Sequence, residues 1–270
     1  MKQIIYIILI LSLCSCEDVV DISLNESEPK LVIDASLNWV KGTSGNHQEI
    51  YLSLTRPFFS GEPTPVNNAL VQISNTNGTV FEFSQNETLG TYETDDFEPM
   101  LNETYLLQIV FENELYVAET QLIPVIPIDF VEQTDNGGIN GEDFEIKPNY
   151  SDPEETENFY FFSFETNITD FPILEVYEDE FTNGNQVFAY YTEEDLQVGD
   201  TVTIKSYGIN ERFYNFMSLL LTQTNSDLGG PFETQPATLR GNIINQTTSS
   251  NFPLGFFRAS EIDEVEYIIQ

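Results

Sequence analysis

Apolar and polar residues alternate with a period of two along much of the chain, which is the pattern of strands buried on one face. The clearest case is 49–55, where Ile50, Leu52 and Leu54 fall on one face and polar residues on the other. Similar runs rich in Val, Ile, Tyr, Phe and Thr predict further strands at 31–37, 69–74, 79–83, 105–111, 115–120, 158–166, 174–177, 187–191, 201–207 and 254–260. We therefore expect a mainly β protein.

Turn residues separate these predicted strands at short intervals. Asn77 and Gly78 form a hairpin signal, because both residue types adopt positive φ readily, and 112–114 supplies a second turn. Short strands joined by short turns are typical of β-sandwiches. Two prolines at 124 and 127 suit an extended connector. The sequence thus predicts two β-sandwich-like domains, at 31–123 and 128–270.

One segment, 210–223, has the periodicity of a helix. Asn210 can cap its first turn, because an asparagine oxygen accepts a hydrogen bond from a free helix N–H. The apolar residues recur at spacings of three and four and form a single stripe: Phe213, Phe216, Met217, Leu220 and Leu221. Such a stripe is more typical of a helix packed on a sheet than of a cofactor site, so we expect the second domain to carry one packed α-helix.

The first residues have the composition of a secretory signal peptide. Lys2 supplies a positive charge, and the apolar stretch that follows ends at Leu13, which is short of the about 20 residues of a transmembrane helix. Leu13, Cys14, Ser15 and Cys16 resemble a lipobox, where bacterial signal peptidase cuts just before a lipidated cysteine. We expect residues 1–15 to be removed; an ordinary cleaved signal is the alternative.

Both cysteines of the chain lie in this segment, so cleavage before Cys16 leaves a single sulfur, which would carry acyl chains such as palmitate. The mature chain is then expected to have no disulfide, no thiol nucleophile and no cysteine metal site. Residues 16–30 are polar and acidic and predict a tether. Acidic residues directly after a lipidated cysteine resemble the surface-export signals of Bacteroidota lipoproteins, which implies an outer-membrane location facing the cell exterior.

The charge balance is strongly negative, with 45 Asp and Glu against 9 Lys and Arg and a net charge of −36. Such a surface repels nucleic acid, so we exclude a nucleic-acid partner. Simple solubility explains the acidity better than a dedicated cation site does. The 21 Phe and 13 Tyr are enough for a sizeable core, which excludes a disordered chain.

Few residues suggest chemistry. The only histidine, His47, lies in a polar loop without a second metal ligand at a usual spacing, so a solvated loop residue is expected. Acidic residues are so common that no carboxylate pair for glycoside hydrolysis can be singled out. A loop candidate for Ca²⁺ is weak, because it does not match the EF-hand pattern; its residues are Asp135, Asn136, Asn140 and Asp143. We find no phosphate-binding or dinucleotide motif and expect no cofactor.

Several ordered pieces of the chain resemble one family of Bacteroidota outer-membrane lipoproteins, the domain of unknown function family 4249. The pieces are 16–21, 29–34, 65–73, 90–92, 232–236, 241–243 and 254–257. The strand 69–73, with 90–92 and 105–107, also resembles small transthyretin-like or immunoglobulin-like modules. The family resemblance implies a TonB-dependent outer-membrane barrel as partner. It supplies no catalytic residue.

Three functions fit these observations. The first is a lipid-anchored, non-enzymatic accessory of a TonB-dependent transporter that captures a small ligand, a peptide or a glycan. The second is a carboxylate-based, glycan-directed surface hydrolase, which needs two acids about 5–10 Å apart in a cleft. The third is a structural or adhesive surface protein, which predicts a large exposed apolar patch instead of a pocket.

Overall fold

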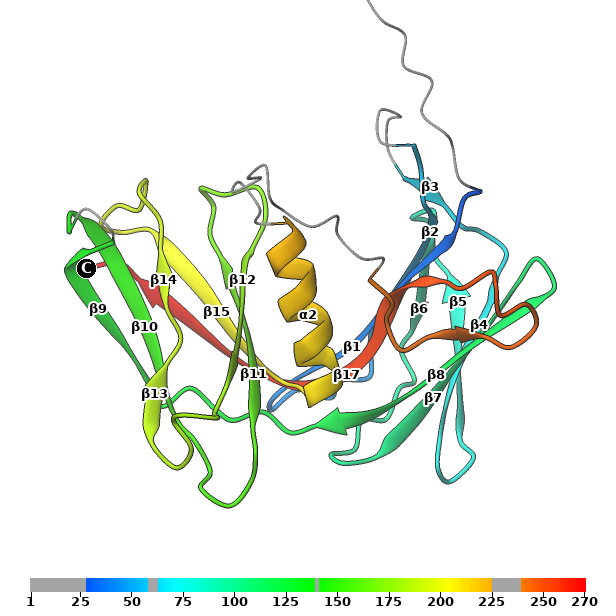
Figure 1. The fold of residues 1–270 in the computed structure, drawn as a ribbon, viewed down its shortest axis with the longest axis horizontal. Helices are drawn as coiled ribbons and strands as arrows, with labels where there is room; N and C mark the ends of the chain where they lie inside the picture. Colours follow the sequence, from blue (N-terminus) through cyan, green and yellow to red (C-terminus); the bar gives the residue numbers. More distant parts are fainter. Residues whose placement is uncertain (1–27, 58–62, 139–140, 225–238) are drawn as a thin grey trace, which may run out of the picture.

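The computed structural model describes residues 28–57, 63–138, 141–224 and 239–270. Within these residues the chain forms seventeen strands and one α-helix, α2 (Glu211–Thr224), which confirms the predicted mainly β fold with a single helix (Figure 1). No helix of the described part is long and apolar enough to cross a membrane.

Eight strands close around the first hydrophobic core, on the right of Figure 1. They are β1 (Leu31–Val40), β2 (Gln48–Leu54), β4 (Leu70–Asn75), β5 (Val80–Gln85), β6 (Thr91–Thr94), β7 (Thr104–Phe111), β8 (Glu114–Ile123) and β17 (Leu254–Ile268). The order is β17-β1-β2-β6-β5-β4-β7-β8, and β8 pairs again with β17 to close the ring. Two short strands extend it: β3 (Thr64–Pro65) pairs with β2, and β16 (Ile244–Asn245) pairs with β8.

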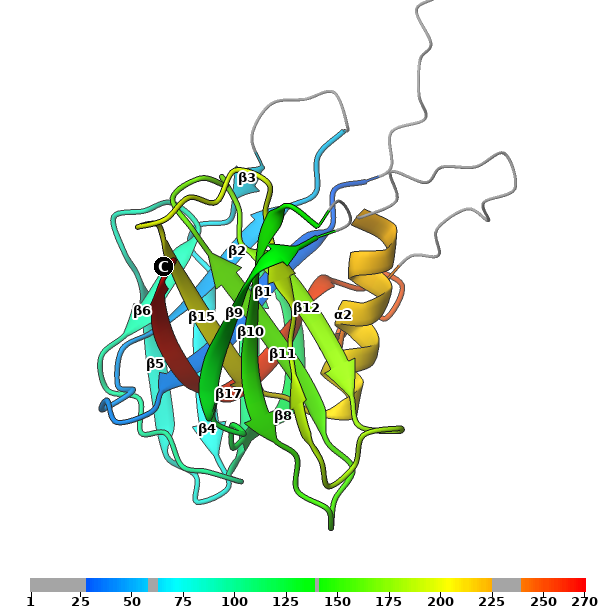
Figure 2. The same ribbon diagram turned by 90° about the vertical axis from the view of Figure 1, so that its left-hand side faces the viewer.

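The second half of the molecule is layered. Its strands are β9 (Phe130–Gly137), β10 (Asp143–Ser151), β11 (Phe159–Glu165), β12 (Ile173–Glu178), β13 (Gln186–Phe188), β14 (Tyr191–Thr192) and β15 (Thr201–Gly208). One face of the sheet β12-β11-β15-β17 packs on the sheet that β10 organises, through residues such as Phe162 and Ile204. The opposite face carries α2, through Phe161 and Phe213. Figure 2 views the molecule from the side of β9 and β10, with α2 at its edge.

The last strand joins both halves. Residues 254–262 of β17 run parallel to β1, and residues 262–268 run antiparallel to β15. Near its start the strand presses so closely on β1 that a Cβ on Gly255 would meet the backbone oxygen of Ile33 at 2.0 Å. Gly255 also has a φ of +98°, so both space and backbone require glycine there.

Most predicted elements lie where the alternation placed them, and Asn210 caps α2 by accepting a 3.0 Å hydrogen bond from the Phe213 N–H. The turn at 112–114 is also confirmed, because Glu112 and Asn113 both have positive φ between β7 and β8. The structure differs at the predicted loop 135–143, which belongs to the hairpin β9–β10 apart from residues 139–140, outside the described part.

The predicted division into 31–123 and 128–270 meets one complication. Ile243, Phe257 and Ala259, from the second predicted domain, are buried in the first core. The connector is also held by β17, because the N–H groups of Val125 and Ile128 donate to the carboxylates of Glu261 and Asp263. The first core is therefore built from both ends of the described chain.

Candidate functional site

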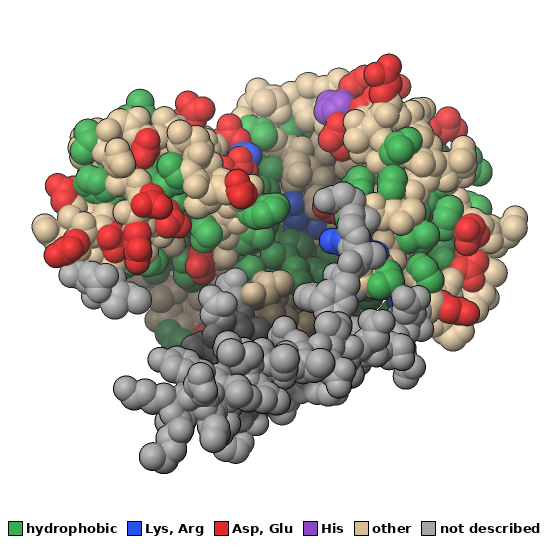
Figure 3. All heavy atoms as spheres, turned by 90° about the horizontal axis from the view of Figure 1, so that it is seen from above, with side chains coloured by type: hydrophobic (Ala, Val, Ile, Leu, Met, Phe, Trp, Pro, Cys, Tyr) green, Lys and Arg blue, Asp and Glu red, His purple; other side chains and the backbone are tan. Residues whose placement is uncertain are grey.

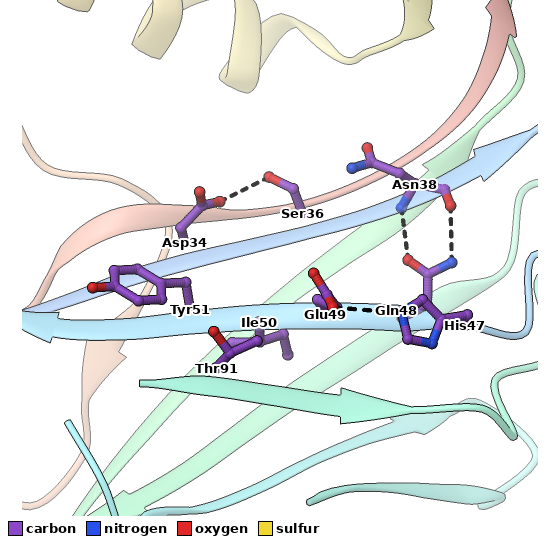
Figure 4. Close-up of a pocket in the computed structure, with 9 residues that line it drawn as sticks. All are labelled: Asp34, Ser36, Asn38, His47, Gln48, Glu49, Ile50, Tyr51 and Thr91. Carbon is purple, nitrogen blue, oxygen red and sulfur yellow. Dashed lines mark hydrogen bonds and ion pairs between the residues drawn. The ribbon is translucent and has the colours of Figure 1, made fainter. Parts of the chain in front are cut away.

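An open groove of about 530 Å³ lies on the outer face of β1 and β2. Alternation explains its polar lining: Ile33, Ala35 and Leu37 of β1 are buried in the core, so the residues between them face outward. Figure 4 shows the residues around it: Asp34, Ser36, Asn38, His47, Gln48, Glu49, Ile50, Tyr51 and Thr91. The groove thus gathers hydrogen-bonding groups and one exposed aromatic ring, Tyr51.

The groove opens because β1 and β2 separate. Their ladder ends at the pair Asp34 and Tyr51, beyond which the two ribbons diverge (Figure 4). The buried Gln48 side chain bridges the gap: its Oε1 accepts from the Asn38 N–H, and its Nε2 donates to the Asn38 carbonyl, each at 2.8 Å. Nε2 donates a further hydrogen bond to the Gly45 carbonyl, which fixes the orientation of the Gln48 amide. These hydrogen bonds stabilise the separated arrangement of β1 and β2.

A cluster of one imidazole and three carboxylates lies at one end of the groove. His47 Nδ1 is 2.8 Å from Asp95 Oδ1, and Nε2 is 3.5 Å from Glu49 Oε1. Glu93 of β6 is the register partner of Glu49 on β2. Ligand atoms of His47, Glu49 and Glu93 lie within 4.8 Å of one another, the only such group of three or more His, Cys, Asp or Glu in the described ranges.

The electrostatics of this cluster favour a positive charge. The hydrogen bond to Asp95 raises the pKa of His47, and Glu49 adds to the effect, while partial burial opposes it. The His47 side chain is 55% exposed, so solvent screens these interactions. In Figure 3 the histidine, in purple, lies at the surface beside red acidic side chains, which are spread over both lobes. The cluster is therefore open to ions from solvent.

The wall of the groove is tied to the interior by Arg258. This buried guanidinium donates from Nη2 to Asn38 Oδ1 at 2.9 Å. Its Cζ lies 4.9 Å from the centre of the Tyr207 ring and 5.2 Å from that of Phe213. Arg258 thus contacts both the groove lining and the aromatic rings beneath α2.

His47 is an exposed residue outside the strands, as the sequence predicts, but the sequence does not reveal the carboxylates around it. Glu49 follows two residues later on β2, the partner strand β6 brings Glu93 opposite it, and Asp95 comes just after the end of β6. The available signal was a spacing of two residues in each of two pairs, His47 with Glu49 and Glu93 with Asp95. It could not be used without knowing that β2 pairs with β6.

The remaining predicted site residues fall partly outside the described residues. Asp135 and Asn136 lie on β9, and Asp143 begins β10. Asn140 lies outside the described residues, so the calcium loop stays a prediction. The predicted lipobox of Leu13, Cys14 and Ser15 and the predicted lipidation residue Cys16 also lie outside them, so these stay predictions.

The sequence profile of the family described as Domain of unknown function (DUF4249) matches residues 17–266. The chain belongs to this family. The resemblance stated from the sequence is confirmed to that extent.

Other comparisons add little. No curated protein matches the chain. A two-domain fibronectin type III segment of chicken tenascin is 10% identical, with a TM-score of 0.22, over 67% of this chain and 91% of that one. A DUF4785 family protein from Legionella pneumophila is 13% identical, with a TM-score of 0.23, over 65% of this chain and 51% of that one. Neither likeness is close enough to support an argument about function.

Proposed function

We propose that the chain is a lipid-anchored, non-enzymatic protein of the outer-membrane surface that captures a hydrophilic ligand for a TonB-dependent transporter. The lipobox ending at Cys16 supports the anchor, and the family match begins at residue 17, just after the proposed first residue of the mature chain. The Bacteroidota origin, the exterior location and the transporter partner rest on the family resemblance.

The groove on β1 and β2 is the observation that carries this proposal. It is open, polar and flanked by Tyr51, whose side chain is 38% exposed, a combination suited to a glycan or peptide. Ser36 Oγ donates to Asp34 Oδ1 at 3.0 Å, so this hydroxyl is engaged with a carboxylate and not with the imidazole. The lining therefore favours binding over nucleophilic catalysis.

Cationic groups gather where the tether joins the body. Lys30 Nζ lies 3.8 Å from the centre of the Phe252 ring, and Arg240 Cζ lies 3.7 Å from it. Two cations on one ring are notable in a chain with a net charge of −36. They offset part of the repulsion between the acidic body and anionic headgroups at the end nearest the proposed anchor.

We further propose that the eight-stranded ring and the layered half are two β-sandwich-like domains, the first of immunoglobulin or transthyretin type. Two separate hydrophobic clusters support this division, one centred on residues such as Ile50 and the other on residues such as Phe164.

A gentle detergent pull-down of the tagged, lipidated chain from its own membranes tests the partner. Mass spectrometry is expected to find a stoichiometric TonB-dependent barrel, and a chain recovered alone would contradict the accessory role. A screen of glycans and peptides tests capture. Tyr51→Ala should abolish binding of any hit, while Tyr190→Ala, which removes a ring 37% exposed in the other half, should not.

A further inference from the structure

We propose that His47, Glu49 and Glu93 bind a divalent transition-metal ion of the Zn²⁺ class at the end of the groove, with Asp95 and Asn86 positioning two of the ligands. This inference concerns the metal alone. It holds whether or not the chain serves a transporter, and its test requires neither a transporter nor a captured ligand.

The strand register creates the site. Glu49 and Glu93 are direct partners across β2 and β6, and His47 and Asp95 lie two residues further along on the same side. Like charges directly opposite one another on a sheet are destabilising unless something neutralises them. Among the described residues, the only basic group that forms an ion pair with Glu49 is the imidazole of His47, whose Nε2 lies 3.5 Å from Glu49 Oε1. A bound cation would neutralise both carboxylates at once.

The donor set selects the class of ion. Imidazole nitrogen and carboxylate oxygen are ordinary Zn²⁺ ligands, with metal–ligand distances of about 2.0–2.2 Å. Ligand atoms that now lie within 4.8 Å of one another need only small side-chain rotations to meet around such an ion. Ca²⁺ and Mg²⁺ prefer all-oxygen sites, so the nitrogen ligand disfavours them.

Two of the three ligands, His47 and Glu93, are oriented by hydrogen bonds to neighbouring side chains. Asp95 engages Nδ1 of His47, which leaves Nε2 as the metal-binding nitrogen and fixes the ring. Asn86 Nδ2 donates a 2.9 Å hydrogen bond to Glu93 Oε2, which leaves the other oxygen available. Metal sites commonly show such an outer layer of hydrogen-bond partners around their ligands.

The side of the site away from the sheet is open. His47 and Glu49 both line the groove, so coordination positions not filled by protein face it. Three protein ligands with an open position form the arrangement of zinc sites that bind a further water or ligand. The inferred ion therefore offers a captured ligand a direct anchoring point.

The test is a Zn²⁺ titration of the full chain in detergent, stripped beforehand with chelator, followed by calorimetry at about pH 8, where an ordinary imidazole is neutral. One saturable site is expected. His47→Gln and Glu93→Gln should each abolish it, and Asp95→Asn should weaken it by about 10- to 100-fold. Glu82→Gln, which removes an exposed carboxylate from β5, should bind like the unmodified chain.

A second measurement separates a real site from weak binding to the acidic surface. His47 is the chain's only histidine, so its imidazole gives one set of ring signals by NMR. Stoichiometric Co²⁺ should shift or broaden those signals, and the unfolding temperature should rise with Zn²⁺ in the unmodified chain but not in His47→Gln. Absence of saturable binding, or equal binding by His47→Gln, would overturn the proposal.

Discussion

Arg258 Nη2 donates a 2.9 Å hydrogen bond to Asn38 Oδ1, and this bond links the groove to the aromatic cluster beneath α2. Burial lowers the pKa of the Arg258 guanidinium, because water is replaced by protein around a charge. Its Nε and Nη1 have no hydrogen-bond partner in the part of the chain that the structure describes. The rings of Tyr207 and Phe213 therefore provide much of what stabilises the charge.

The first prediction separates the contribution of Arg258 packing to stability from that of its charge. Arg258→Ala leaves a cavity beside the aromatic cluster beneath α2 and should lower the free energy of unfolding by about 2–5 kcal/mol. Arg258→Met fills much of that space without a buried charge, so it should retain most of the stability. Urea unfolding followed by circular dichroism measures both variants. Equal losses in the two would show that the charge, and not the packing, matters.

The second prediction follows from the continuous strand β17, which should make the two cores unfold together. Ile204 is fully buried in the second core and pairs with Val265 of β17, so Ile204→Ala should destabilise by about 2–5 kcal/mol. Trp39, the only tryptophan, packs against the first core and reports on it by fluorescence. In Ile204→Ala, the unfolding midpoint followed by Trp39 fluorescence should shift by as much as the midpoint followed by circular dichroism. An unchanged Trp39 transition would show that the cores unfold independently.

Local patterns account for the elements that the sequence predicted. The strand at 49–55 and the helix at 210–223 were found because burial on one face repeats every two residues in the first and every three or four in the second. The β9–β10 hairpin was missed because its acidic and glycine residues are typical of loops. The continuation of β17 beyond Ser260 was missed because acids interrupt its alternation.

Long-range pairing accounts for what the sequence could not predict. Closure of the ring needs β17 beside β1, in a register that joins Val32 to Leu254. No local pattern contains that register. The His47 cluster depends in the same way on β2 meeting β6, and its residues are unremarkable until Glu93 lies opposite Glu49. A lone histidine in an acidic chain is thus informative only once strand pairing is known.

The third prediction is a loss of stability at alkaline pH that involves Tyr177. Burial raises the pKa of this phenol to about 12, and Glu175 adds to the effect. The unfolded phenol ionises near pH 10, so the unfolded state releases its proton first as pH rises. The contribution of Tyr177 is therefore fully present below about pH 10 and is lost as pH rises through about 12.

Tyr177→Phe tests this contribution. The variant should reduce the fall in unfolding free energy between about pH 10 and pH 12, measured by urea unfolding. At neutral pH it should destabilise by about 1 kcal/mol, because the phenolic oxygen accepts a 3.1 Å hydrogen bond from the Tyr190 N–H. Tyr190→Phe, in which the hydroxyl removed belongs to an exposed side chain, serves as control. An identical alkaline fall in both variants would contradict the assignment.

The fourth prediction is that Glu175→Gln stabilises the protein at neutral pH. Glu175 is half-buried on β12, opposite the fully buried Phe162, and no described residue donates a hydrogen bond to its carboxylate. Burial raises its pKa, because the charged form is disfavoured away from water. The cost of burying the Glu175 charge exists where its carboxylate is ionised and disappears as pH falls below about 4, where folded and unfolded chains are both protonated.

Glu175→Gln should therefore raise the unfolding temperature near pH 7 and lose that advantage near pH 4. Glu82→Gln, on the exposed face of β5, should change little at either pH. A gain from Glu175→Gln that is the same at both pH values would assign the effect to packing of the amide.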